Sequence, residues 1–288
     1  MATLKVIRKR IGSVRNTQQI TKAMKMVSAA KLRRAQEAAV QARPYAEKMT
    51  ELLKNVAARV ANDAHPLLTP REEKKVLLVL FTSDRGLCGG YNTNMIRAAE
   101  AFIRQQAGDR QIELTLVGRK GGDHFRRRGA KIADRYVDIL YKAADELAGE
   151  IAQKLISRFV SGEVDAVYIL YSRFRSALSQ VPTLEKLLPV ALAESIEVQA
   201  QQQTEYLYEP GVEQLLASLL PRITGVTVQR ALLEATASEH GARMTAMESA
   251  SGNASKMIGS LTLQMNRARQ ASITRELLEI VGTAEALK

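Results

Sequence analysis

Apolar residues near the start of the chain recur at steps of three and four positions. The series consists of Leu4, Ile7, Ile11, Val14, Ile20, Met24 and Val27. This spacing is typical of one face of an α-helix, so residues 3 to about 60 are predicted to be helical. The series is blurred between Thr17 and Thr21. A repeat that is less strict than a heptad allows two paired helices to run straighter than in a supercoil.

A second series lies near the other end of the chain. It consists of Met244, Met247, Ser251, Ala254, Ile258, Leu261, Met265, Ala268 and Ser272. The alternating steps predict a coiled-coil seam whose small residues let two helices approach closely. No proline follows Pro221, so a helix of about 65 residues is predicted, roughly 100 Å long. The two end helices are predicted to pair with each other in antiparallel orientation.

Prolines mark the predicted interruptions of these helices. Pro44 is predicted to kink or restart the first helix. Pro221 is predicted to lie in the first turn of the long C-terminal helix, after a short helix over residues 211–219. The polar and proline residues from Asn62 to Pro70 are predicted to form a linker.

The middle of the chain has a different pattern. Strands are predicted over 75–81, 112–117, 131–133 and 166–171 and more weakly over 190–193, helices over 94–106 and 143–160, and loops over 83–91 and 118–122. Strands that alternate with helices are typical of βαβ units with a mainly parallel sheet. The predicted fold is therefore α/β plus all-α. It is a long antiparallel coiled coil of N- and C-terminal helices (1–62 and 210–288) with an inserted Rossmann-like α/β domain (74–205).

Positive charge is concentrated at the N-terminus. The whole chain of 288 residues has a formal net charge of +12, and its first 43 residues contain eleven Lys and Arg and one acid, Glu37, a net charge of +10. Because clustered like charges repel one another, an acidic partner is predicted: a protein, a nucleic acid or membrane headgroups. No apolar run is long enough to span a bilayer, and no apolar signal core follows the basic start.

Few residues suggest catalytic chemistry. The loop SDRGLCGGYN, from Ser83 to Asn92, lies where a phosphate could bind, but its G-x-x-G-G spacing favours a tight turn, and no Walker A motif occurs. Because the chain has one cysteine, Cys88, an internal disulfide is excluded. Its three histidines are scattered and, with Cys88, offer no spacing typical of metal ligands. No cofactor or catalytic residue is predicted. The basic stretch from Gly118 to Gly129 could bind phosphates or nucleic acid, or be a solvated loop.

Three separated blocks resemble the gamma subunit of bacterial ATP synthase. They are SVRNTQQITKAMKMVSAAKLRRAQ (Ser13 to Gln36), SDRGLCGGYN (Ser83 to Asn92), and the C-terminal runs SEHGARMTAM and NRARQASITRELLEI. The resemblance implies a non-catalytic central rotor shaft with a coiled coil inside a ring of alpha and beta subunits. It implies further contacts with the epsilon subunit and the membrane-embedded c-ring. It also implies a peripheral membrane protein at the cytoplasmic face of the inner membrane.

The resemblance also implies partner contacts for individual residues. Met24 would meet the acidic lever of the catalytic subunits, and Arg85 belongs to a loop beside the shaft. The upper shaft contact would comprise Arg269, Gln270 and Thr274, and the foot on the c-ring would be the YLYE segment from Tyr206 to Glu209. Two alternatives stay open from the residues alone: a basic helical hairpin that binds nucleic acid, which the resemblance does not imply, and an α/β enzyme that uses the Gly-rich loop.

Overall fold

The computed structural model describes residues 4–57, 65–106, 108, 110–138, 144–190 and 211–285. Its helices are α1 (Leu4–Ala57), α2 (Tyr91–Gln106), α3 (Arg119–Arg127), α4 (Ala144–Val160) and α5 (Val212–Glu285). Its strands are β1 (Lys75–Phe81), β2 (Gln111–Val117), β3 (Ile132–Tyr136), β4 (Ala166–Phe174) and β5 (Gln180–Leu188). The chain divides into two compact units. The first combines residues 1–28 with 243–288, and the second comprises residues 29–242.

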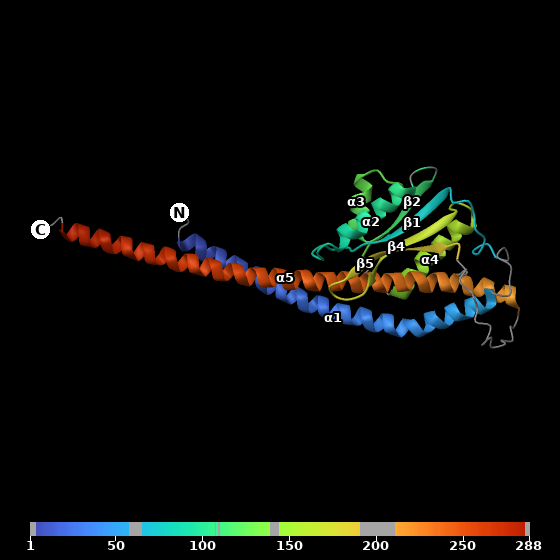
Figure 1. The fold of residues 1–288 in the computed structure, drawn as a ribbon, viewed down its shortest axis with the longest axis horizontal. Helices are drawn as coiled ribbons and strands as arrows, with labels where there is room; N and C mark the ends of the chain where they lie inside the picture. The colour runs from blue at the N-terminus through green and yellow to red at the C-terminus, as the bar shows by residue number, and fades with distance from the viewer. Residues whose placement is uncertain are drawn as a thin grey trace. The chain divides into compact units, whose positions relative to one another are not determined.

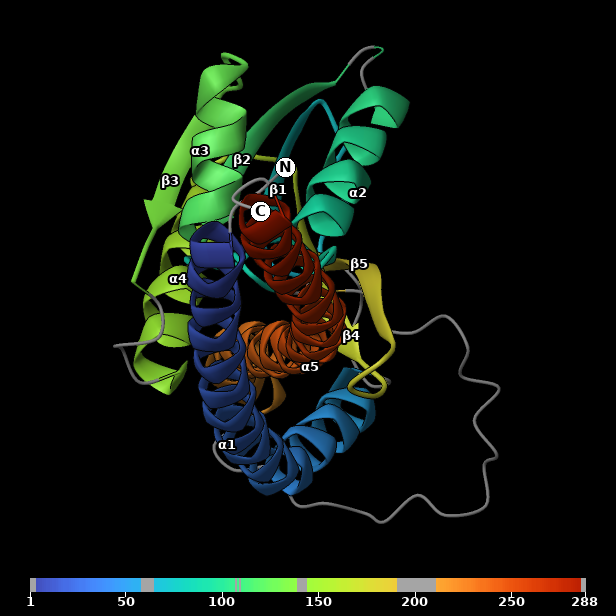
Figure 2. The same ribbon diagram turned by 90° about the vertical axis from the view of Figure 1, so that its left-hand side faces the viewer.

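The first unit is an antiparallel pair of helical segments, from α1 and α5, which Figure 2 shows side by side. Ile7 and Ile11 pack with Leu261 in a small apolar cluster. The Gln18 side-chain amide donates a hydrogen bond of 2.5 Å to the Ser255 hydroxyl. Further along, the Lys25 ammonium lies 2.5 Å from the Glu248 carboxylate. Because partner numbers fall on α5 as they rise on α1, the predicted antiparallel pairing is confirmed.

The predicted seam of α5 is confirmed, whereas that of α1 needs correction. Ile20 and Val27 are 60% and 56% exposed, and Thr21 and Ser28 are buried in the seam instead. The Thr21 hydroxyl donates a hydrogen bond to the Gln18 carbonyl at 3.0 Å. This bond satisfies the polar group and so offsets the free-energy cost of burying it. The steps of three and four therefore continue through Gln18, Thr21 and Ser28, and polar side chains hid this from a search for apolar residues.

The second unit contains a five-stranded sheet in the order β3-β2-β1-β4-β5. The first four strands are parallel, and β5 pairs antiparallel with β4 at one edge. The central strand β1 has six buried residues in a row, because helices cover both faces of the sheet. One face packs against α2 and α3, and the other packs against α4 and residues 215–235 of α5 (Figure 1). This is the predicted mainly parallel α/β arrangement.

Several predicted boundaries were wrong. Pro44 lies inside continuous α1, which excludes the predicted restart but not the predicted kink, and Pro221 lies inside continuous α5, so no separate helix over 211–219 occurs. The predicted loop over 118–122 is the beginning of α3. The edge strand β5 was missed because it is polar on one face and contains Pro182, which only an edge strand tolerates. The weaker strand predicted at 190–193 is not formed at Val190, and its other residues lie outside the described ones.

Candidate partner-binding surfaces

The basic face of α1 is open to solvent. The exposed Lys and Arg side chains between residues 5 and 22 are Lys5, Arg8, Lys9, Arg10, Arg15 and Lys22. Among the described cations of α1 in the first unit, Lys25 forms an ion pair, with Glu248, and no ion pair is found for the others. The positive charge predicted from the sequence is therefore not neutralised by the chain's own described carboxylates, and it remains available to an acidic partner.

The end of α5 is apolar and exposed. In the described part of α5 beyond Ser272, the last residue of the seam, the large apolar side chains that are exposed are Ile273, Leu277, Leu278, Ile280 and Val281, between 49% and 67% exposed. At 100° per residue they cover a face about 160° wide. The side chains of Arg269 and Gln270, about one turn before these apolar residues, and of Thr274, among them, are also exposed. The structure therefore brings the three predicted upper-contact residues together next to an apolar surface that the sequence analysis missed.

The other predicted contact residues lie in separate places. The Met24 side chain is half-buried on α1, in the first unit, next to the buried Thr21. Arg85 is exposed in the loop after β1, in the second unit. Tyr206 and Glu209 lie outside the described residues. The predicted contact residues that the structure describes therefore belong to both units.

The loop from Ser83 to Asn92 is held by its own side chains. The Asn92 side-chain amide donates to the Ser83 hydroxyl at 2.7 Å and to the Cys88 sulfur at 3.2 Å. In return, the Asn92 carbonyl oxygen accepts the Ser83 backbone N–H at 3.0 Å. Cys88 is buried, and Leu87 beside it has a φ of 64° and is exposed. This internal bonding agrees with the tight turn that the glycine spacing favours.

The N-terminus of α3 already has acceptors from the chain itself. The Arg119 backbone N–H donates to the Asp84 carboxylate, that of Lys120 to the Ser83 carbonyl, and that of Gly121 to the Thr82 hydroxyl, each at 3.0 Å. A phosphate bound at a helix N-terminus would need these same donors. The geometry therefore gives no support to a nucleotide site at the start of the basic stretch from Gly118 to Gly129.

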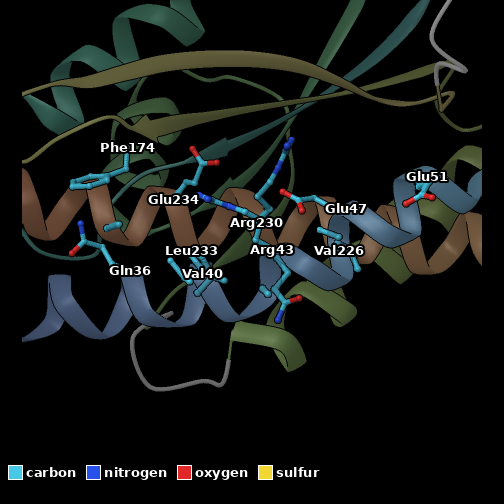
Figure 3. A pocket seen from close by; sticks show the side chains of 15 residues that line it. Gln36, Val40, Arg43, Glu47, Glu51, Phe174, Val226, Arg230, Leu233 and Glu234 are labelled. Atoms are coloured by element: carbon cyan, nitrogen blue, oxygen red, sulfur yellow. The ribbon is translucent and has the colours of Figure 1, made fainter. Parts of the chain in front are cut away.

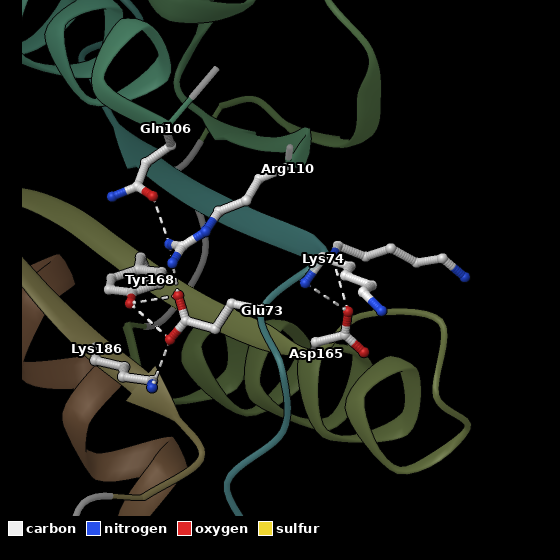
Figure 4. Close-up of polar contacts among 8 residues, drawn as sticks. Glu73, Lys74, Gln106, Arg110, Asp165, Tyr168 and Lys186 are labelled. Carbon is white, nitrogen blue, oxygen red and sulfur yellow. Dashed lines mark hydrogen bonds and ion pairs between the residues drawn. The ribbon is translucent and has the colours of Figure 1, made fainter. Parts of the chain in front are cut away.

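A partly exposed charge cluster surrounds Glu73 at the amino-terminal edge of the sheet (Figure 4). Its carboxylate accepts the Tyr168 hydroxyl at 3.0 Å and lies 2.7 Å from the Lys186 ammonium and 2.8 Å from the Arg110 guanidinium. Burial alone would raise the pKa of Glu73, but bonds from Lys186 and Tyr168 and the nearby cations outweigh it and lower the pKa. Burial and the bond to Glu73 raise the pKa of Tyr168 to about 12. The cluster therefore links four parts of the chain: the segment before β1, the segment before β2, strand β4 and strand β5.

Glu73→Gln should lower the free energy of unfolding at neutral pH by about 2–3 kcal/mol, because it leaves two cations without their carboxylate. Since the folded-state pKa of Glu73 is lowered, its contribution is complete above the ordinary carboxyl value and is lost as the pH falls through the folded value. The difference between variant and wild type in urea unfolding should therefore shrink below about pH 4. Glu72→Gln, beside it but 79% exposed, is the control and should change little. A pH-independent difference would contradict this assignment.

No helix among the described residues is both long and apolar enough to cross a membrane.

Comparisons with known proteins agree with the three sequence blocks. A model of the family described as ATP synthase matches residues 3–287. The ATP synthase gamma chain of Geobacter metallireducens is 53% identical over 289 aligned positions, which cover all of both chains. The ATP synthase gamma chain of Trichlorobacter lovleyi is 51% identical over 289 positions, again over all of both chains.

Solved structures of similar chains also come from ATP synthases. One is a chain from the central stalk and c-ring of Tetrahymena thermophila mitochondrial ATP synthase, with a TM-score of 0.62 and 29% identity over 81% of this chain and 99% of that one. A chain of Euglena gracilis mitochondrial ATP synthase shares the fold, with a TM-score of 0.71 and 22% identity over 99% of this chain and 94% of that one. On the sequence matches, which extend over its full length, the chain belongs to the ATP synthase gamma-chain family.

Proposed function

We propose that this chain is the central rotor shaft of an ATP synthase. It turns inside a ring of alpha and beta subunits and couples proton-driven rotation of the c-ring to the conformational cycle of the catalytic subunits. The chain itself has no catalytic site in this proposal, and ATP is made on the partner subunits. The observation that carries the proposal is the exposed apolar end of α5, which extends a basic antiparallel helix pair.

The apolar end of α5 suits a shaft that rotates in a sleeve. Fully burying one such side chain is worth about 1.5–3 kcal/mol, so five exposed ones favour a partner surface. Hydrophobic contact is not directional, so it can hold a helix end while the helix turns. Directional contacts from Arg269 and Gln270, about one turn earlier, and from Thr274, among the apolar residues, would be made and broken at particular angles of rotation.

The basic face of α1 suits acidic loops on the inner side of the ring. Charge attraction falls off over about 8–10 Å at physiological salt, so it guides the shaft without locking it at one angle. Met24 and Arg85 are the residues that we assign to contacts with the catalytic subunits. Two paired helices resist bending better than one, which torque transmission requires.

The membrane end of the shaft is assigned to the segment from Tyr206 to Glu209, which would touch the c-ring beside the epsilon subunit. The Tetrahymena relative comes from a structure described as central stalk and c-ring, which supports a contact between the shaft and the c-ring. The chain would then be a peripheral membrane protein at the cytoplasmic face of the bacterial inner membrane.

The nucleic-acid alternative has less support. A surface for single strands combines cations with aromatic side chains on which bases stack. The described part of α1 contains one aromatic residue, Tyr45, far along the chain from the densest cations. No described feature favours nucleic acid over a protein ring.

A tagged copy of the chain tests the proposal in mildly solubilised native membranes. The purified material should hydrolyse ATP and contain several larger nucleotide-binding subunits for each copy of the chain. Recovery of the chain alone, or with nucleic acid and without ATPase activity, would contradict the shaft.

Replacing both Arg269 and Gln270 with alanine should lower ATP turnover by the assembled complex about three- to tenfold. The reason is that charge-assisted hydrogen bonds to a partner carboxylate are lost. Turnover per purified complex is the measurement. The matched control replaces Arg267 and Gln264, which are the same two residue types, exposed on the same helix. Unchanged turnover, or an equal loss in the control, would contradict the assigned contact.

A further inference from the structure

The two helices that cover one face of the sheet are strongly basic. Helices α2 and α3 contain six Lys and Arg and two acids, a net charge of +4. The Glu100 carboxylate of α2 lies 2.9 Å from the His124 ring of α3, so the two helices are neighbours. Each helix connects two parallel strands, so both run in the same direction. The basic stretch from Gly118 to Gly129 is thus part of a larger charged surface.

Four cations of this surface point away from the sheet. They are Arg97 and Arg104 of α2 and Lys120 and Arg127 of α3, all exposed, and we call them the outer cations. At 100° per residue, each lies about 145–175° around its helix from the middle of the buried residues, which are Tyr91, Met95, Ala99 and Phe102 of α2 and Gly121, Gly122 and Phe125 of α3. Within each helix the two outer cations are seven residues apart, which is about 10.5 Å along the axis.

The acids of these two helices are committed to other cations. The Glu100 carboxylate lies 3.3 Å from the Arg128 guanidinium, and the Asp123 carboxylate lies 2.9 Å from that of Arg135. Among the described residues, no ion pair is found for any of the outer cations. Helix stability does not explain all of them either, since the helix dipole disfavours a cation such as Lys120 in the first turn of α3.

Other cations of the second unit pair where a carboxylate is close. Arg230, which lines the cavity in Figure 3, lies 2.6 Å from Glu185, and this carboxylate also lies 2.6 Å from Arg173. Arg158 lies 2.6 Å from Glu113. In these clusters the chain supplies the opposite charge itself, whereas the charge of the outer cations is left for a partner.

We propose that the outer cations bind an acidic helix of a partner protein. Carboxylates at every seventh position of a helix are also about 10.5 Å apart, so they match the spacing of the cations on both α2 and α3. Steps of three and four would give such a helix two adjacent rows of carboxylates, one for each helix of this chain. Each exposed pair is weak, so the matched spacing of all four cations would provide the specificity. This interaction is separate from the proposed rotor function and does not depend on it.

Two other acidic partners fit the surface less well. An anionic membrane binds helices that also insert apolar side chains, and none of the large exposed apolar residues belongs to the described part of α2 or α3. A nucleic-acid duplex has one negative charge for about every 1.7 Å of its length, which is far denser than the outer cations. The backbone N–H groups at the beginning of α3, which could bind a phosphate, already have acceptors.

The test uses the full-length chain and two fluorescein-labelled helical peptides of three heptads. Both peptides are rich in alanine and glutamine and contain two glutamates in each heptad. The glutamates form one face of the first peptide and are spread around the second. Fluorescence anisotropy at physiological salt should give a Kd for the first peptide about tenfold or more below that for the second. Equal Kd values, or no saturable binding of the first peptide, would overturn the proposal.

Two paired substitutions locate the site. Arg97→Gln combined with Arg104→Gln, and Lys120→Gln combined with Arg127→Gln, should each weaken binding of the first peptide about tenfold, because two ion pairs are lost in each case. Undiminished binding by both variants would refute the site. A labelled DNA duplex that binds more tightly than the first peptide, and loses affinity in the same two variants, would overturn the choice of a protein partner.

The matched control combines Arg8→Gln with Arg15→Gln. It removes the same charge, at the same seven-residue spacing, from exposed positions of α1. It should change the Kd of the first peptide less than about twofold, because attraction to net charge alone is screened by salt. A loss in the control equal to that in the two test variants would show that the peptide responds to net charge and would refute the site.

Discussion

Replacing Gly118 with alanine should destabilise the second unit by about 4 kcal/mol or more, the largest stability loss that we expect from one methyl group in this chain. Gly118 has a φ of 98°, a conformation that residues with a side chain rarely adopt. A Cβ atom there would lie 2.1 Å from the Thr82 carbonyl oxygen. Backbone, and not a flexible side chain, would have to move, because β1 and β2 are paired along their whole length beside this point.

The matched control is Gly129→Ala. Gly129 also has a positive φ, 67°, but no atom lies within 4 Å of a Cβ built on it. Strain alone should therefore cost about 1 kcal/mol there. Urea unfolding followed by circular dichroism measures both variants. Equal losses of stability in the two variants would show that the backbone near Thr82 moves to relieve the close contact. They would contradict our expectation that the ends of β1 and β2 are rigid there.

The elements that could be predicted are those whose own pattern decides their structure. The run from Val76 to Phe81 is short, apolar and buried on both faces, which is typical of a central strand. The seam from Met244 to Ser272 has an unbroken repeat, and all its positions are buried or half-buried. The positive charge of α1 could also be predicted, because it follows directly from the amino-acid composition of that segment.

The elements that could not be predicted depend on tertiary contacts. Thr21 and Ser28 are in the seam because a neighbouring helix covers them, although neither is apolar. The beginning of α3 depends on Asp84, Ser83 and Thr82, which cap it from a different part of the chain. A glycine-rich stretch such as this one has weak helical propensity of its own.

The candidate contacts show the same division. Arg269, Gln270 and Thr274 were found through a motif, and the structure adds that they are exposed near an apolar helix end. That end could have been noticed from Ile273, Leu277, Leu278, Ile280 and Val281, which continue past the last seam residue.

Met24→Lys should uncouple the assembled complex, lowering ATP-driven proton pumping per ATP hydrolysed about twofold or more. Our assignment places Met24 opposite an acidic lever of the catalytic subunits, and a lysine there would form a new ion pair. If this ion pair contributes about 1.4 kcal/mol and must break during a rotation step, that step becomes about tenfold slower. The Met24 side chain is half-exposed, so a lysine can keep its stem packed and its ammonium in water without unfolding the helix pair.

Met26→Lys provides the matched control. Met26 is 60% exposed and lies two residues further along, about 200° around the helix from Met24. It adds the same charge to the same turn while facing a different direction. Pumping into membrane vesicles and ATP hydrolysis are measured on the same preparations, so that their ratio is independent of assembly yield. A ratio that is normal in Met24→Lys, or lowered equally in both variants, would show that no specific contact at Met24 governs coupling.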